Sequence, residues 1–194
     1  MATRPSLRVV KTPAPVFLLK VELRHLKPVI WRRILVPADI KLPRLHVVLL
    51  RTMGWMGGHL HEFIIGERNF GVPDEDYPEI GLEKEGRVTL IKALGGLKTF
   101  RYLYDYGDAW DHRIKVEKIL SADPTLHSPF CVDGANACPP EDVGGCPGYL
   151  DFLEAIRDPT HEEHQHMLDW CGGHFDPTAF DTSEVNARLA EITL

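Results

Sequence analysis

Apolar and polar residues alternate near the front of the chain. Over residues 17–24 the odd positions are apolar, and charged side chains occupy the even positions from Lys20 to Arg24. A period of two is typical of a strand with one buried face. The turn-like residues 25–28 lead into residues 29–36, which we interpret as the second strand of a hairpin.

The pattern then changes to the spacing of a helix. Pro43 suits the first helical position and Gly54 suits the end. The residues between them carry one apolar stripe, formed by Leu45, Val48, Leu49 and Met53. This spacing predicts a helix that packs on the sheet.

Three less regular segments follow that helix. Residues 59–65 predict a further strand, and residues 66–86 predict a turn-rich excursion. Residues 88–94 fit either a short helix or a strand. The pattern alone does not choose between those two, because a short apolar run suits both.

Two strands, beginning at Thr99 and at Trp110, form the most informative segment. Their apolar residues lie at even positions on both sides of the loop. The two apolar faces coincide only if the loop has an odd number of residues, because a slip of one residue turns every side chain to the other face. A three-residue loop at 107–109 meets this condition. It predicts Tyr104 opposite His112, Asp105 opposite Asp111, and Asp108 at the tip. We also expect contact between Tyr104 and His112 or between their immediate neighbours.

The back of the chain predicts helices. Residues 149–157 form one candidate, and Asp181 begins the last one. Between them, Thr160 and Glu163 have the spacing of a capping box for a helix that ends at Gly172. The sequence therefore predicts an α+β fold, with a mainly antiparallel β-sheet, a packed helix and a C-terminal group of helices. We expect residues 1–15 to be a flexible leader and residues 16–194 to be a single domain.

Charge and length narrow the function. The chain has 194 residues and a formal net charge of −6, which disfavours general nucleic-acid binding. No apolar stretch is long enough to span a membrane, and the first residues lack the apolar core of a signal peptide. We therefore expect a cytoplasmic protein with no membrane partner. A small ligand or a protein partner remains open.

Four cysteines occur, none of them in a Cys-x-x-Cys pair. They are Cys131, Cys138, Cys146 and Cys171. In the cytoplasm we expect reduced thiols rather than disulfides. The alternative is a structural zinc site, in which Cys171 and His174 would join ligands from the loop between residues 131 and 146.

Five blocks of sequence carry a resemblance to a known family. They are Leu23-Arg24 with residues 27–33, residues 59–63, residues 102–112, residues 138–145 and residues 172–177. Together they resemble the family named after the third open reading frame of plasmid pRiA4b, over about residues 17–181. The Tyr-Asp-x-Gly-Asp-x-Trp-x-His block at residues 104–112 and the Cys-Pro-Pro-Glu-Asp-x-Gly-Gly block at residues 138–145 are the specific ones.

The resemblance implies a compact α+β fold that is widespread in prokaryotes and on mobile elements, with no established activity. Some members carry recombinase labels. A tyrosine recombinase needs a His-x-x-Arg segment, and none of the ten histidines has Arg three residues later. The recombinase label therefore has no support in these residues.

Candidate chemistry gathers around the second hairpin. Asp105, Asp108 and Asp111 converge near its tip, and carboxylates that converge suit a divalent cation. The candidate cluster comprises Tyr104, Asp105, Asp108, Trp110, His112, Glu141, Asp142, Arg32 and Arg33. The candidate metal ligands are His59, His61, Asp105, Asp108 and His112, with His59 and His61 on one face of their strand. We expect Asp105, Asp108 and Glu141 to share one cluster, compensated by a metal ion or by Arg32 or Arg33.

Structural roles compete with each of these. His112 suits a hydrogen-bonded core position, and aspartates in tight loops often bond their own backbone. Asp105 and Asp111 could instead pair with Arg101 and Arg113 across the strands. In that case the two carboxylates would form a local set of salt bridges.

Two functional hypotheses follow. We favour a non-catalytic binding or interaction module. The alternative is a metal-dependent hydrolase that acts on a phosphoester-type substrate, so whether the protein is an enzyme stays open. No cofactor is assigned; a divalent metal fits the candidate residues, whereas the absence of phosphate-binding and dinucleotide motifs disfavours a nucleotide cofactor.

Overall fold

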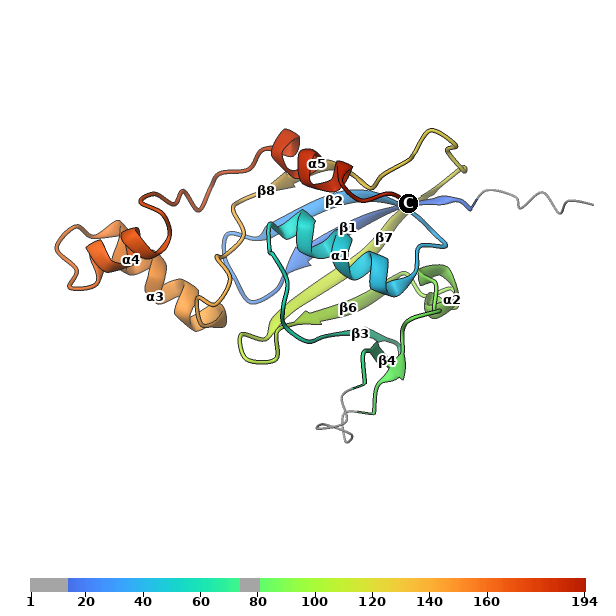
Figure 1. The fold of residues 1–194 in the computed structure, drawn as a ribbon, viewed down its shortest axis with the longest axis horizontal. Coiled ribbons are helices and arrows are strands. Elements are labelled where there is room, and N and C mark those ends of the chain that lie inside the picture. Colours follow the sequence, from blue (N-terminus) through green and yellow to red (C-terminus); the bar gives the residue numbers. More distant parts are fainter. Residues whose placement is uncertain (1–13, 74–80) are drawn as a thin grey trace, which may run out of the picture.

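An eight-stranded sheet forms the centre of the protein (Figure 1). The computed structural model describes residues 14–73 and 81–194. The strands follow the order β5-β4-β3-β6-β7-β1-β2-β8. Their bounds are β1 Val16–Leu23, β2 Ile30–Pro37, β3 His61–Ile65, β4 Arg68–Gly71, β5 Glu83–Lys84, β6 Thr99–Tyr104, β7 Trp110–Leu120 and β8 Phe130–Ala135. Only the short β4–β5 pair is parallel among these strands, so the α+β prediction is confirmed.

The helices fall into two groups (Figure 1). Their bounds are α1 Leu42–Met53, α2 Leu90–Leu94, α3 Gly145–Arg157, α4 His164–Trp170 and α5 Thr182–Ala190. α1 and α5 contact each other, and α5 also packs on β8. α3 and α4 pack on each other and extend past one end of the sheet (Figure 1).

The core lies between the sheet and α1 with α5. Strand periodicity sends Leu19, Val21 and Ile34 into it, and all three are fully buried. α1 adds the apolar stripe that includes Leu45 and Leu49, also fully buried. The helix ends at Met53, as predicted, because Gly54 takes a left-handed conformation and its N–H bonds the Leu50 carbonyl oxygen.

The second hairpin has the predicted parity but a different register. Tyr104 lies opposite Trp110, and Tyr102 lies opposite His112, so the loop has the five residues 105–109. Three and five are both odd, which keeps both apolar faces on the core side. The predicted pairs of Tyr104 with His112 and of Asp105 with Asp111 are wrong. The predicted contact moves to a neighbour, because the rings of Tyr102 and His112 lie 5.4 Å apart.

Asp105 causes the change of register. Its backbone is left-handed, with φ of 58°, and its N–H donates to the Leu60 carbonyl rather than to β7. The ladder therefore stops at Tyr104, and the N–H of Ala109 closes the loop on the Asp105 carbonyl over 2.7 Å.

The connecting segments confirm the helix alternative for residues 88–94 and differ from prediction in three other places. The ambiguous residues 88–94 contain α2, and the excursion at 66–86 contains β4 and β5. α3 begins at Gly145, four residues before the predicted start at residue 149. The proposed capping box is also wrong, because the Thr160 hydroxyl donates to Asp158 and Glu163 caps α4 without a side-chain bond.

The two ends of the chain carried further predictions, a cap for the last helix and a leader at residues 1–15. The Asp181 carboxylate accepts the Ser183 N–H over 2.6 Å and caps α5, as predicted. Most of the leader predicted at residues 1–15 lies outside the described residues. In the described part of the chain, every helix is too short or too polar to cross a membrane.

Candidate functional site

The tip of the β6–β7 hairpin docks on the loop before α3. The Gly144 N–H donates to the Asp108 carboxylate over 3.3 Å. Next to it, Gly145 packs on the backbone of Asp108 so closely that a Cβ would lie 2.4 Å from the Asp108 carbonyl oxygen. Only glycine fits there, so the two specific sequence blocks meet through a glycine contact.

Three potential metal ligands converge beside this contact. His59, Asp105 and Asp142 place one ligand atom each within 4.8 Å of one another. His59 Nδ1 lies 3.5 Å from Asp105 Oδ2, and its Nε2 lies 3.2 Å from Asp142 Oδ1. The side chain of Asp142 is 70% exposed, whereas that of Asp105 is 13% exposed. The set is therefore anchored in the protein on one side and open to solvent on the other.

The backbone orients both carboxylates. Asp105 and Asp142 have positive φ angles of 58° and 60°, a backbone conformation that is uncommon for residues other than glycine. In addition, Asp105 Oδ1 accepts the Gly107 N–H over 2.9 Å, which leaves Oδ2 facing His59. Strained residues of this kind are frequent at functional sites.

Tyr104 and Glu141 hold the backbone next to the three converging ligands. The Tyr104 hydroxyl donates to Glu141 over 2.7 Å, and the N–H groups of Met56 and Gly57 donate to the same carboxylate. Burial first, and then Glu141, raise the pKa of Tyr104. The phenol therefore stays protonated at neutral pH, and Glu141 holds the loop that carries His59.

Trp55 completes this support. Its ring stacks on Tyr104, with 5.3 Å between centroids, and its Nε1–H donates to the Pro139 carbonyl over 2.9 Å. It also stacks on the buried Trp110 at 5.7 Å. Trp110 therefore acts as a core residue under the site.

His112 and His61 lie apart from the three converging ligands. His112 is fully buried, and its Nδ1 lies 3.1 Å and 3.0 Å from the carbonyls of Tyr102 and Trp110. Burial lowers the pKa of His112 to about 4, so it is a neutral core residue at pH 7. His61 turns to Glu85, with 3.2 Å between Nε2 and Oε2. The prediction that His59 and His61 share one face of a strand is wrong, because β3 begins at His61 and His59 precedes it.

Neither predicted arginine reaches the tip. Arg32 is buried, and its guanidinium donates to the carbonyls of Trp31, Ala135 and Asn136 and to the Cys138 sulfur. Arg33 lies on the opposite face of the sheet and pairs with Glu117 over 2.7 Å. The prediction that one of them compensates the tip is therefore wrong, because backbone carbonyls and another strand already engage them.

Asp111 does not lie with Asp105 and Asp108 at the hairpin tip. It lies opposite Leu103 and pairs with Arg24 and Arg101, the latter over 3.0 Å. Burial alone would raise the pKa of Asp111, but Arg101 and Arg24 together hold it below its ordinary value. This is the structural ion pair with Arg101 that the sequence offered as an alternative; Arg113 does not take part.

The family described as plasmid pRiA4b ORF-3-like protein matches residues 15–184. The chain belongs to this family.

Two proteins are similar to this chain over most of its length. The uncharacterized protein y4hQ of Sinorhizobium fredii is 43% identical over 182 residues, which cover 92% of this chain and 93% of that protein. A crystal structure of a protein of unknown function, MM3350 from Methanosarcina mazei Go1, is 33% identical and has a TM-score of 0.80. That match covers 89% of this chain and 98% of the other. Neither description states an activity, so the function has to be argued from the site.

The four cysteines of this family member are free thiols. Cys138 is packed among Arg32 and Met53, and burial raises its pKa to about 11. Within residues 14–73 and 81–194, His59, Asp105 and Asp142 are the one set of three potential ligands that lie within reach of one ion. The alternative zinc site at Cys171 and His174 therefore has no third ligand in the described chain.

Sequence reasoning missed the half-buried His46. The rings of His46 and His61 stack with 3.6 Å between centroids, and His46 Nδ1 lies 2.7 Å from the Tyr102 hydroxyl. Burial, and then the charge of His61, lower the pKa of His46 to about 3. Little in the sequence indicated this role, because His46 lies within α1 and interrupts neither the helix pattern nor the apolar stripe.

Proposed function

We propose that the protein is a binding module that holds a divalent transition-metal ion at His59, Asp105 and Asp142. The convergence of these three ligand atoms within 4.8 Å supports this proposal. We further propose that residues 16–194 act as a single domain in the cytoplasm, where the four free thiols would stay reduced.

The ligand set favours one class of metal. One imidazole nitrogen with two carboxylate oxygens suits zinc, manganese or iron better than calcium, which takes six to eight oxygen ligands. Three protein ligands leave coordination positions for water or for a bound ligand. The exposed Asp142 provides access from solvent.

A proton on His59 is the competing occupant of this site. An imidazolium between Asp105 and Asp142 would form two ion pairs without any metal, consistent with the separations of 3.5 and 3.2 Å. The two occupants respond differently to metal. A metal site binds zinc or manganese with one ion per chain, whereas an imidazolium bridge binds neither.

The deciding experiment is calorimetric titration of chelator-treated, tag-free protein with ZnCl₂ and MnCl₂. We expect Asp105→Asn and His59→Ala to weaken binding at least about tenfold. Asp108→Asn is the matched control, because Asp108 lies at the same tip but its carboxylate contacts Gly144. Binding that is absent in the wild type, or equal in Asp105→Asn and Asp108→Asn, contradicts the proposal.

The geometry keeps hydrolysis as the second candidate. Open coordination positions at an exposed metal are what a hydrolase needs. Against it, Tyr104 and Glu141 are bonded to each other, so neither is free as a general base beside the three ligands. Turnover of bis-(p-nitrophenyl) phosphate by the metal-loaded protein, lost in Asp105→Asn, would establish the hydrolase.

A further inference from the structure

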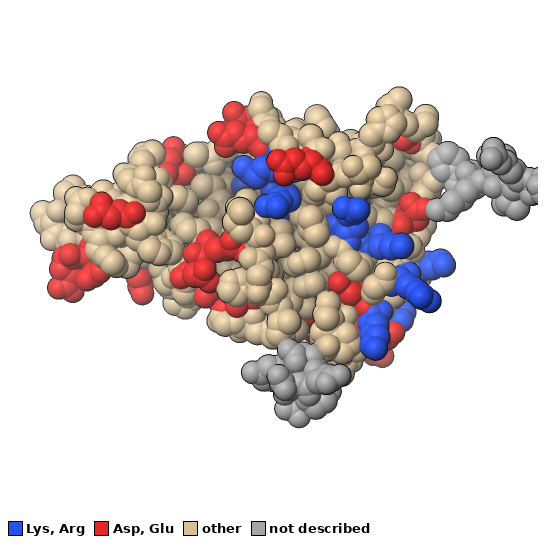
Figure 2. Space-filling view, in the orientation of Figure 1, with Lys and Arg blue, Asp and Glu red and all other residues tan. Residues whose placement is uncertain are grey.

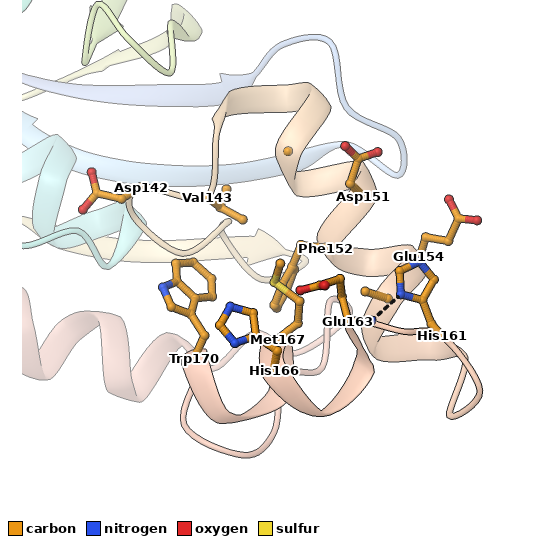
Figure 3. A pocket seen from close by; sticks show the side chains of 12 residues that line it. Asp142, Val143, Asp151, Phe152, Glu154, His161, Glu163, His166, Met167 and Trp170 are labelled. Carbon is orange, nitrogen blue, oxygen red and sulfur yellow. Dashed lines mark hydrogen bonds between the residues drawn. The ribbon is translucent and has the colours of Figure 1, made fainter.

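A cavity of about 550 Å³ lies between α3, α4 and the loop before α3 (Figure 3). It is distinct from the three converging ligands, although Asp142 contributes to both. Its volume is within the range of sites that bind small molecules.

The floor of the cavity is apolar. Phe152 on α3 faces Met167 and Trp170 on α4 (Figure 3). The rings of Phe152 and Trp170 meet edge to face with 5.8 Å between centroids. Trp170 remains 44% exposed, so much of its surface is available to a ligand. An apolar floor with an open indole suits methylene groups and cations.

The rim of the cavity is acidic. Asp142 lies at one end of the lining, and Asp151 and Glu154 lie at the other, with the apolar side chains between them (Figure 3). Glu163 lies next to Met167 (Figure 3). No Lys or Arg lines the cavity. Among the described residues, Asp151, Glu154 and Glu163 have no cationic partner within ion-pair distance.

We propose that this cavity binds an aliphatic polyamine. A linear polyamine carries ammonium groups separated by methylene segments, which matches carboxylates at both ends of an apolar floor. The carboxylates supply charge-assisted hydrogen bonds, and Trp170 supplies a cation–π contact. An acidic small molecule would meet repulsion from the carboxylates of Asp142, Asp151, Glu154 and Glu163, and a neutral one would leave these carboxylates without partners.

This inference does not require the metal site. Asp142 lines the cavity and is also one of the converging ligands, but Glu163, Glu154 and Trp170 belong to the cavity alone. His59→Ala is expected to weaken metal binding at least about tenfold and to retain polyamine binding, because His59 does not line the cavity. The failure of one proposal is thereby separated from the failure of the other.

The test is calorimetric titration of chelator-treated protein with spermidine. We expect saturable binding that Glu163→Gln weakens roughly tenfold, as expected for the loss of one charge-assisted bond. Trp170→Ala is expected to weaken binding by about fivefold through loss of the cation–π contact. Glu162→Gln is the matched control, because Glu162 is the neighbouring exposed carboxylate and does not line the cavity.

Three outcomes overturn the inference. The first is no saturable binding of spermidine. The second is equal weakening by Glu163→Gln and Glu162→Gln, which would show a general attraction to an acidic surface. The third is equal binding of 1,6-hexanediol, which has the methylene body without the charges. Circular dichroism and a thermal melt of each variant show whether the fold is retained.

Discussion

The sheet with α1 and α5 differs from the α3–α4 pair in how much it buries and in how it is charged. The strands and α1 share one continuous core, whereas no residue of α4 is buried. Residues 141–180, which include α3 and α4, hold nine Asp and Glu but only one Lys or Arg, out of 28 and 22 in the whole chain. On the face in view in Figure 2, the lobe that contains α3 and α4 shows acidic but no basic side chains. Stability is concentrated in one region, and unpaired charge in the other.

The candidate metal site lies where these two regions meet. His59 and Asp105 belong to the sheet region, and Asp142 belongs to the loop that leads into α3. A ligand held there would connect a rigid part to a weakly packed part. The predictions below test that division.

The largest expected effect is in the core. Leu49→Ala removes a fully buried side chain and is expected to lower the free energy of unfolding by about 3 kcal/mol. Met167→Ala, in the half-buried α3–α4 contact, is expected to cost only about 1 kcal/mol. Urea unfolding of both variants measures the two values. Equal losses would mean that the two regions are equally packed.

A second test concerns the junction. Gly145→Ala forces a Cβ to within 2.4 Å of the Asp108 carbonyl at a φ of +66°, so we expect a loss of about 2 to 3 kcal/mol and weaker metal binding. Gly95→Ala is the control, since Gly95 also has a positive φ, +53°, but its Cβ would contact nothing within 4 Å. If both variants lose the same amount, the tip and the loop are not coupled.

The third test is the pH dependence of the free energy of unfolding, which we expect to come from buried histidines of the sheet region. The pKa of His112 falls from its ordinary 6.5 to about 4 in the folded protein because the ring is buried. The unfolded chain therefore takes up the proton first, and stability is fully present above pH 6.5 and is lost as the pH falls toward 4. We expect a loss of about 2 kcal/mol between pH 7 and pH 5 from this group. His46, with a pKa lowered to about 3, acts in the same direction.

His112→Phe provides the check on that expectation. Whatever its absolute stability, this variant should show a shallower fall in the free energy of unfolding between pH 7 and pH 5. Urea titrations at several pH values give the slope. An unchanged slope would show that His112 is not the responsible group.

The smallest expected effect is at the start of α5. Asp181→Ala removes the side-chain acceptor of the Ser183 N–H and should cost about 1 kcal/mol. Asp176 makes a similar bond to Thr178 outside any helix, so Asp176→Ala is the matched control with a smaller loss. Thermal unfolding distinguishes them, and a larger loss in the control would contradict the assignment.

Local periodicity predicted much of the fold. The alternation in β1 and the stripe of α1 specify which side chains are buried, because each follows from the geometry of one element. The register of the β6–β7 hairpin could not be predicted in the same way. It depends on the left-handed Asp105, whose N–H bonds Leu60, a partner 45 positions earlier in the chain. The start of α3 was missed because glycines 144, 145 and 148 are typical of loops. Backbone contacts explain two of them, since a Cβ on Gly145 would meet the Asp108 carbonyl oxygen and a Cβ on Gly148 would meet the Val143 carbonyl oxygen.

The candidate site shows the same limit. The sequence brought together Asp105, Asp108 and Glu141, and in the structure all three lie around the junction of the hairpin and the 141–145 loop. It assigned the compensating charge to Arg32 or Arg33, because it could not show that carbonyls of residues 135 and 136 already accept from Arg32. It placed His59 and His112 on equal terms, although one is a surface residue and the other is buried.

The position of β1 between β2 and β7 has a consequence for synthesis of the chain. β1 pairs with β2 across a short turn, but its other edge pairs with residues as late as Leu120. During translation at about 5 to 20 residues per second, that edge therefore waits roughly 5 to 20 seconds for its partner. Over this interval the nascent β1–β2 hairpin exposes an unpaired, apolar strand. Chaperones that cover such edges are therefore expected to act on this protein before its second hairpin has left the ribosome.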